Sequence, residues 1–259
     1  MEWLNRAADL NKTGAVLCNQ GKEVEALEYF RGALELLSIL AKGFQDTTFS
    51  MTMWPSAPLL TPTKIMCSKA NQSCNSPPTI LSSLQQSQPK EEEEEESPPP
   101  FARALPSASD RDEGLLFVYR RALLFKPTTW VDTDRLSCYI AIIEFNMGLA
   151  IHLQSRTGGE KALLDALHVY DHCLGHINRI DTGFSVESSQ VLFAALNNKA
   201  AIFYEFCSFQ NSRQVLEALL NAITCSKNTG VLNEIKDEDL EGFLFNAMLM
   251  KGASVAPSA

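Results

Sequence analysis

The stretch Ala26-Leu27-Glu28-Tyr29-Phe30-Arg31-Gly32-Ala33-Leu34 reads A-L-x-x-F-x-x-A-L and decides the fold. Residues 166–174 repeat the pattern as A-L-x-x-Y-x-x-C-L, and residues 215–223 keep its spacing as V-L-x-x-L-x-x-A-I. Each copy follows another apolar helical pattern that has a small residue near its middle. A repeat of this kind predicts stacked helix pairs, an architecture that usually provides a binding surface and seldom a catalytic site.

Apolar residues recur with the helical period on both sides of these copies. The spacing predicts helices over 3–19, 23–42, 132–154, 160–180, 185–209, 212–227 and 237–250. Asp132 or Asp134 is placed to cap the third of them, and 157–159 is the expected turn after it. Small residues on the first helix of each pair, Gly14, Gly148 and Ala201, let two helix backbones approach closely.

The stretch 115–125 is mostly apolar and is stopped by Pro127. Its length fits either a short helix or a buried strand, and periodicity does not separate the two. The flanking glycine and proline favour an extended conformation.

The first helix pair resembles the tetratricopeptide repeat (TPR) family at the positions of Gly14, Leu17, Gly21, Ala26, Phe30 and Ala33. Ser38 stands where that family usually has its closing proline. The arrangement is also similar to uncharacterised TPR-like proteins of microalgae, which imply no activity. The resemblance implies an all-α, TPR-like helical-hairpin solenoid of about three helix pairs plus a capping helix.

The composition divides the chain into four parts. Residues 1–44 form the first predicted hairpin, and 113–251 hold the remaining hairpins and the cap. Between them, 45–112 contain ten of the twelve prolines and the glutamate run 91–96, which together predict a disordered, Pro/Ser-rich acidic insertion. The tail 252–259 is also predicted to be disordered.

The acidic run has two possible roles besides that of a solubilising spacer, which is the interpretation we favour. It can dock a basic partner, or fold back onto Arg120 and Arg121.

Charge and cysteine usage exclude several classes of protein. The net charge is −9, and removing the six glutamates of the run leaves −9 + 6 = −3, so no basic face for nucleic acid is expected. The N-terminus lacks the form of a signal peptide, and we expect no transmembrane segment and no membrane partner. The seven cysteines are odd in number and form no Cys-x-x-Cys, which favours an intracellular location, cytoplasmic or nuclear.

The histidines are the only cluster with possible chemistry. His168, His172 and His176 are spaced i, i+4, i+8 on one predicted helix, which permits a metal site. Because Ala166 and Tyr170 occupy its core face, His168 and His172 are expected to point outward as a solvated stripe. No nucleotide-binding, metalloprotease or nucleophile motif is present, so we expect no enzyme, no metal and no cofactor.

In the resembled family, partners bind the concave face formed by the first helix of each pair. Carried over, that face consists of Asn11, Asn19, Phe145, Leu149, His152, Asn198 and Glu205. Asn11 replaces the lysine with which chaperone-binding members hold a carboxylate, so chaperone-tail binding is not expected. A second interpretation is that Phe145 and Leu149 are covered by the inserted segment or by the next helix.

The predicted function is a protein–protein interaction adaptor or scaffold that binds a peptide or partner helix on this concave face. One alternative is a small metal-binding or catalytic helical protein that uses His168, His172 and His176. Another is a structural subunit whose homo-oligomer interface buries Phe145 and Leu149.

Overall fold

The computed structural model describes residues 1–45, 116–181 and 185–252. Every element of regular secondary structure in these residues is helical. The predicted insertion beyond residue 45, its glutamate run and the tail from residue 253 lie outside the described residues.

The first hairpin consists of α1 (Glu2–Asn19) and α2 (Glu23–Gln45), close to the predicted ranges. Gly21 takes a φ of +70° in the turn between them. At their closest approach, a Cβ on Gly14 would lie 2.5 Å from the Phe30 ring, so only glycine fits at this point. The small–aromatic pairing predicted from the sequence therefore holds this hairpin together.

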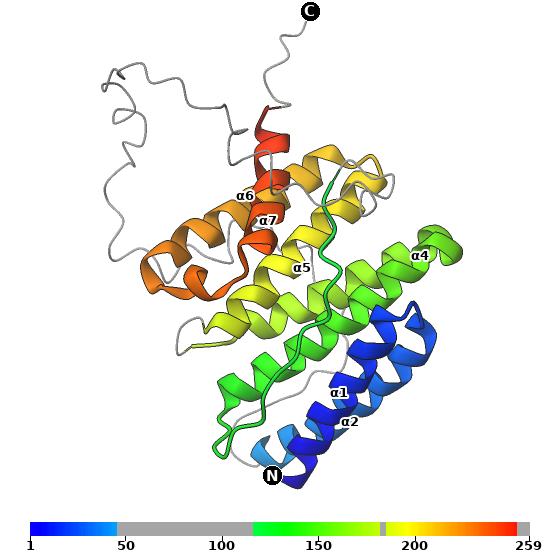
Figure 1. Cartoon of the computed structure of the whole chain (residues 1–259), viewed down its shortest axis with the longest axis vertical. Coiled ribbons are helices and arrows are strands. Elements are labelled where there is room, and N and C mark those ends of the chain that lie inside the picture. Colours follow the sequence, from blue (N-terminus) through cyan, green and yellow to red (C-terminus); the bar gives the residue numbers. More distant parts are fainter. Residues whose placement is uncertain (46–115, 182–184, 253–259) are drawn as a thin grey trace, which may run out of the picture.

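The second hairpin is a single helical run, α4 (Thr133–Ile177), that doubles back at Gly159 (Figure 1). Asp132 caps its start by accepting a hydrogen bond from the Arg135 N–H at 2.8 Å. The predicted turn at 157–159 is shortened to one non-helical residue, Gly159, with φ 66° and ψ −156°. Gly148 meets Tyr170 as Gly14 meets Phe30, at a Cβ distance of 2.7 Å.

The first half of α4 has the length and the apolar character of a membrane-spanning helix. This part of the helix is Thr133–Ser155, and 78% of its most apolar 18-residue segment is buried inside the protein. A mostly buried core helix has the same composition, so this stretch is weak support for a membrane span.

The third hairpin consists of α5 (Val186–Glu205) and α6 (Phe209–Ser226). The prediction that its first helix reaches residue 209 is wrong, because Cys207 adopts a left-handed φ of +55° and ends the helical path. Two short 3₁₀ helices, Lys227–Thr229 and Val231–Glu234, lead into α7 (Asp237–Gly252).

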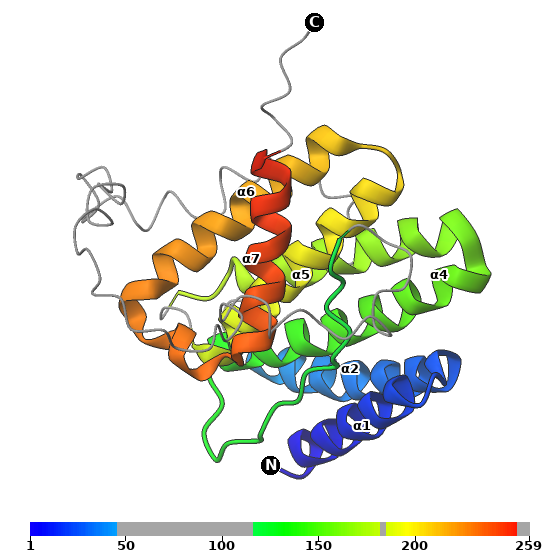
Figure 2. The ribbon, with the colours of Figure 1, turned by 45° about the horizontal axis from the view of Figure 1, so that its top comes forward.

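The helices pack in chain order, with α2 against α4, α4 against α5, α5 against α6 and α6 against α7. Large buried side chains mark the core along the whole stack: Phe30, Phe145, Tyr170, Phe193 and Phe243. One stretch without helix, residues 116–125, crosses this stack as a long trace over α5 and α4, beside α7 (Figures 1 and 2). We call these ten residues the strap.

Candidate functional site

We call the surface of the stack on which the strap lies the groove, and asparagine side chains of this groove bind the main chain of the strap. They come from α1, α4, α5 and α7, and we call the set the asparagine row: Asn11, Asn146, Asn197, Asn198 and Asn246. All five are fully buried. An asparagine amide carries one acceptor and two donors, so it can pair with the N–H and the C=O of an extended chain.

The pairing repeats at alternate strap residues. The Tyr119 N–H donates to Asn198 Oδ1 at 2.8 Å, and the Tyr119 carbonyl accepts from Asn198 Nδ2 at 2.9 Å. The Leu123 N–H donates to Asn146 Oδ1 at 2.7 Å, and its carbonyl accepts from Asn146 at 2.8 Å and from Asn11 at 3.0 Å. Each residue thus makes the two hydrogen bonds that a neighbouring strand would give.

Phe117 is held in the same way at the other end of the groove. Its N–H donates to Asn246 Oδ1 at 2.8 Å, and its carbonyl accepts from Asn246 at 2.7 Å and from Asn197 at 2.9 Å. Asn246 also donates to Asn197 Oδ1 at 2.7 Å. The strap therefore begins at α7 and ends near α1, opposite to the chain order of the helices.

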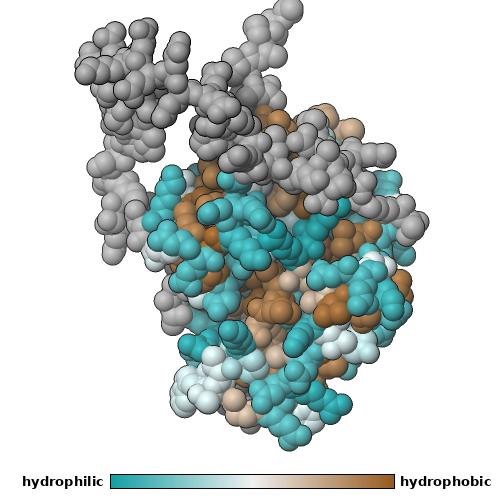
Figure 3. All heavy atoms as spheres, in the orientation of Figure 1, coloured by the Kyte–Doolittle hydropathy of each residue, from teal (hydrophilic) through white to brown (hydrophobic). Residues whose placement is uncertain are grey.

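Three odd strap positions enter the core, those of Tyr119, Leu123 and Phe125, whereas Phe117 is half-buried and Arg121 is exposed. Tyr119 is 1% exposed, and its ring lies 5.5 Å from that of Phe243 and 6.0 Å from that of Phe145. Phe125 stacks on Tyr139 with ring centres 4.5 Å apart. Of the even strap positions, Leu116 is buried and Leu124 is 55% exposed. The face of the molecule drawn in Figure 3 shows apolar surface between hydrophilic margins.

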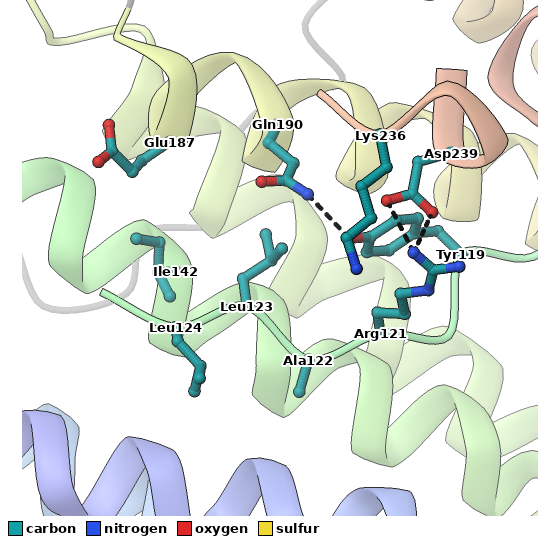
Figure 4. A pocket seen from close by; sticks show the side chains of 10 residues that line it. All are labelled: Tyr119, Arg121, Ala122, Leu123, Leu124, Ile142, Glu187, Gln190, Lys236 and Asp239. Atoms are coloured by element: carbon teal, nitrogen blue, oxygen red, sulfur yellow. Dashed lines mark hydrogen bonds and ion pairs between the residues drawn. The ribbon is translucent and has the colours of Figure 1, made fainter. Parts of the chain in front are cut away.

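The asparagine row is interrupted at Arg121, where the strap is held through a side chain instead. Arg121 Nη2 donates to Glu238 Oε2 at 2.7 Å, and its Nη1 lies 3.1 Å from Asp239 Oδ1 (Figure 4). Burial raises the pKa of Asp239, and the charges of Arg121 and Lys236 oppose that effect. A cavity of about 330 Å³ lies beside this ion pair, with Lys236 among the residues that line it.

A second set of polar contacts, which we call the supporting layer, connects Asn198 of the asparagine row to Tyr170, His152 and Glu205. Asn198 also donates to the Tyr170 hydroxyl at 3.2 Å, and His152 Nδ1 lies 3.5 Å from the same oxygen. Glu205 lies 3.7 Å from His152 Nε2. Burial raises the pKa of Tyr170, so its hydroxyl stays protonated and orients Asn198 rather than acting as a base.

Of the predicted concave-face residues, Asn11 and Asn198 bind the strap directly. Phe145 and Leu149 are fully buried, and the Phe145 ring lies 6.0 Å from that of the strap's Tyr119 and 5.8 Å from that of Tyr170. They are already enclosed within a single chain, so a homo-oligomer is not needed to bury them.

His152 and Glu205 lie in the supporting layer, and Asn19 is exposed at the last residue of α1. Sequence reasoning missed Asn146, Asn197 and Asn246. The available signal was an asparagine on the first helix of each unit, within five residues of Gly14, Gly148, Ala201 or Gly242.

The histidine stripe divides into three environments. His168 is exposed, His172 is half-buried, and His176 is buried with Nε2 3.8 Å from Glu144 Oε1. Of the two histidines predicted to point outward, His168 is exposed and His172 is half-buried. Within the described ranges no group of three His, Cys, Asp or Glu side chains is placed to hold a metal ion.

Two further side chains, a thiol and a guanidinium, have structural contacts within the described residues. The Cys173 thiol is buried and donates to the Ala141 carbonyl at 3.3 Å. Arg121, considered above as a contact for the acidic run, pairs with Glu238 and Asp239, and the run itself lies outside the described residues.

No protein-family model, curated protein or solved structure matches this chain. The resemblance to the TPR family therefore rests on the residues that carry it, above all the paired contacts of Gly14 with Phe30 and of Gly148 with Tyr170.

Proposed function

We propose that this chain is a protein–protein interaction adaptor with a TPR-like stack, and that its groove binds an extended polypeptide segment. The strap is then the occupant that holds the groove when no partner is present. The observation that supports this function is the pairing of the asparagine row with main-chain N–H and C=O groups.

Every residue type except proline carries both of those main-chain groups, so the asparagine row suits any extended segment. Main-chain hydrogen bonds supply affinity in such sites, and pockets for alternate side chains supply specificity. Here the pockets are those that receive Phe117, Tyr119 and Leu123.

The strap competes with a partner because it belongs to the same chain. A tethered occupant acts at an effective concentration of roughly millimolar, so a partner segment binds the intact chain weakly unless the strap is loosened. The apparent affinity falls in proportion to the fraction of open groove. The adaptor is therefore self-occluded.

The test uses the full chain with Tyr119→Ala, which weakens the strap and leaves the groove residues unchanged. A fluorescent peptide of residues 116–126, which keeps its tyrosine, is titrated against it and followed by anisotropy. We expect saturable binding to the variant that is at least about tenfold tighter than to the unaltered chain. Adding Asn198→Ala to the variant should weaken that binding.

A peptide of the same composition in scrambled order is the matched control. Circular dichroism of each chain verifies that the helices persist. A second host chain carries Leu123→Ala in place of Tyr119→Ala, and it shows whether the result depends on a local defect at residue 119. Equal binding of both peptides, or no binding to either host while the helices persist, would contradict the proposed function.

A further inference from the structure

We propose that the groove selects a segment with a basic residue at its centre, in the pattern aromatic-x-aromatic-x-Arg/Lys-x-aliphatic, and that Asp239 recognises that basic residue. This inference rests on the proposed function and states the chemistry of the partner. It concerns the strap position at which the asparagine row is interrupted.

The asparagine row cannot fix the register of a bound segment. A segment shifted by two residues offers the same N–H and C=O groups to Asn146 and Asn198, because main-chain groups do not differ between residues. Something other than the row must therefore determine which residue lies at each position.

Asp239 supplies that discrimination. It is 2% exposed, its Oδ1 lies 3.1 Å from Arg121 Nη1, and its Oδ2 accepts from the same nitrogen at 3.3 Å. Figure 4 shows Arg121 and Asp239 directed toward each other beside the cavity. A shift of two residues would place Tyr119 or Leu123 against this carboxylate and leave a buried charge without its cation.

The neighbouring charges do not provide an alternative. Glu238, which also binds Arg121, is 75% exposed at its side chain, so water can replace its cation. Lys236 lines the same cavity and its charge also lowers the pKa of Asp239, but Arg121 is the cation whose nitrogen lies 3.1 Å from this carboxylate. Asp239 is thus the buried group that depends on the occupant.

A second pocket supports the aromatic end of the pattern. Gly242 faces Phe117 so closely that a Cβ would lie 2.5 Å from the ring. The aromatic residue at Gly242 and the basic residue at Asp239 are therefore positions i and i+4 of the segment, a spacing that defines both its direction and its register.

The experiment compares three peptides of residues 116–126 on the Tyr119→Ala chain: the unchanged sequence, Arg121→Glu, and Arg120→Glu. The last is a matched control, because it makes the same charge change at the adjacent position. We expect Arg121→Glu to weaken binding by about 10- to 100-fold, as loss of a charge-assisted hydrogen bond does, and Arg120→Glu by less than about threefold.

The same peptides are then measured on a chain with Tyr119→Ala and Asp239→Asn. Because competition from the strap is identical for all peptides on one host, it cancels in the ratio of two affinities. The penalty for Arg121→Glu should fall to nearly that for Arg120→Glu on this host.

Three results would overturn the inference. Equal losses of affinity for the two glutamate peptides would mean that the groove responds to the net charge of the peptide and not to the position of its basic residue. An Arg121→Glu penalty that persists on the Asp239→Asn host would assign recognition to another group. Binding of no peptide to any host would remove the proposed function itself, whereas the first two results leave peptide binding intact.

Discussion

Gly242 of α7 and Phe117 of the strap are in such close contact that the glycine has no room for a side chain. A Cβ at residue 242 would lie 2.5, 2.6 and 2.7 Å from three atoms of the Phe117 ring. The ring also packs edge-on against Phe243, 6.1 Å away. The strap and its groove are thus fitted to each other in shape as well as in hydrogen bonding.

Gly242→Ala is expected to destabilise the chain by about 1–3 kcal/mol, because the added methyl group forces Phe117 out of its site. Urea unfolding measures the change, and hydrogen exchange should rise at residues 117–119. Gly175→Ala is the control, since its Cβ would meet no atom within 4 Å and alanine favours a helix by up to about 1 kcal/mol. Equal destabilisation by both substitutions would contradict the fit.

Asn198→Ala is expected to lower the free energy of unfolding by at least about 3 kcal/mol. It leaves the Tyr119 N–H, the Tyr119 carbonyl and the Tyr170 hydroxyl without this partner, and each buried unpaired group costs about 1–3 kcal/mol. Asn19→Ala, at an exposed asparagine, should change it by less than about 0.5 kcal/mol. A loss below about 1 kcal/mol for Asn198→Ala would mean that the strap is not held by the row.

The described cysteines should separate into two reactivity classes. Cys207 and Cys225 are exposed, whereas burial raises the pKa of Cys18 and Cys138 to about 12 and that of Cys173 well above its ordinary value. Thiolate is the reactive form, so native alkylation should modify the first two alone. Peptide mapping by mass spectrometry checks this, and alkylation in urea should reach all five.

The ionisation of Glu144 and that of His176 should change the stability of the fold in opposite directions as the pH changes. Burial raises the pKa of Glu144 to about 8, against the opposing charge of Arg179, and burial lowers the pKa of His176 to about 4. Both groups are therefore uncharged at pH 7, although they lie 3.8 Å apart.

Above pH 6.5, Glu144 is the one of these two groups that changes the free energy of unfolding with pH, because the unfolded chain has lost the Glu144 proton that the folded chain keeps. Stability should fall as pH rises from 6.5 to 8, by up to roughly 1.4 kcal/mol per pH unit. Glu144→Gln should remove that slope in urea titrations. Between about pH 4.5 and 6.5 the two effects oppose each other, because the folded chain keeps a proton on Glu144 that the unfolded chain has lost, while the unfolded chain holds a proton on His176 that the folded chain lacks. His176→Gln should therefore make stability rise, relative to the unaltered chain, as the pH falls through this range. A wild-type slope unchanged by Glu144→Gln would assign the titration elsewhere.

Most of the helical frame could be predicted from the sequence, because apolar periodicity and the small–aromatic pairs are local signals. Gly14 with Phe30 and Gly148 with Tyr170 illustrate this, and the start of α4 at Asp132 follows from capping. The end of α5 could not be predicted, since Cys207 in a left-handed conformation carries no sequence signature.

The site was predicted in part. The concave-face positions identified Asn11 and Asn198, but a polar residue on an inner helix does not show what it binds. Asn246 meets Phe117 across 129 residues of sequence, and no local pattern encodes such a contact. The glycine and proline that flank 115–125 favoured an extended conformation, but only the packed structure shows that its main chain fills the groove.

The strap also changes how a repeat stack should unfold. In a stack where each unit touches only its neighbours, terminal units can melt independently. Here Asn11 of α1 binds Leu123 while Asn246 of α7 binds Phe117, so the seven consecutive residues 117–123 tie the first unit to the last. The occupied chain should therefore melt in one cooperative transition, and loosening the strap should let the α1–α2 pair melt on its own at a lower temperature.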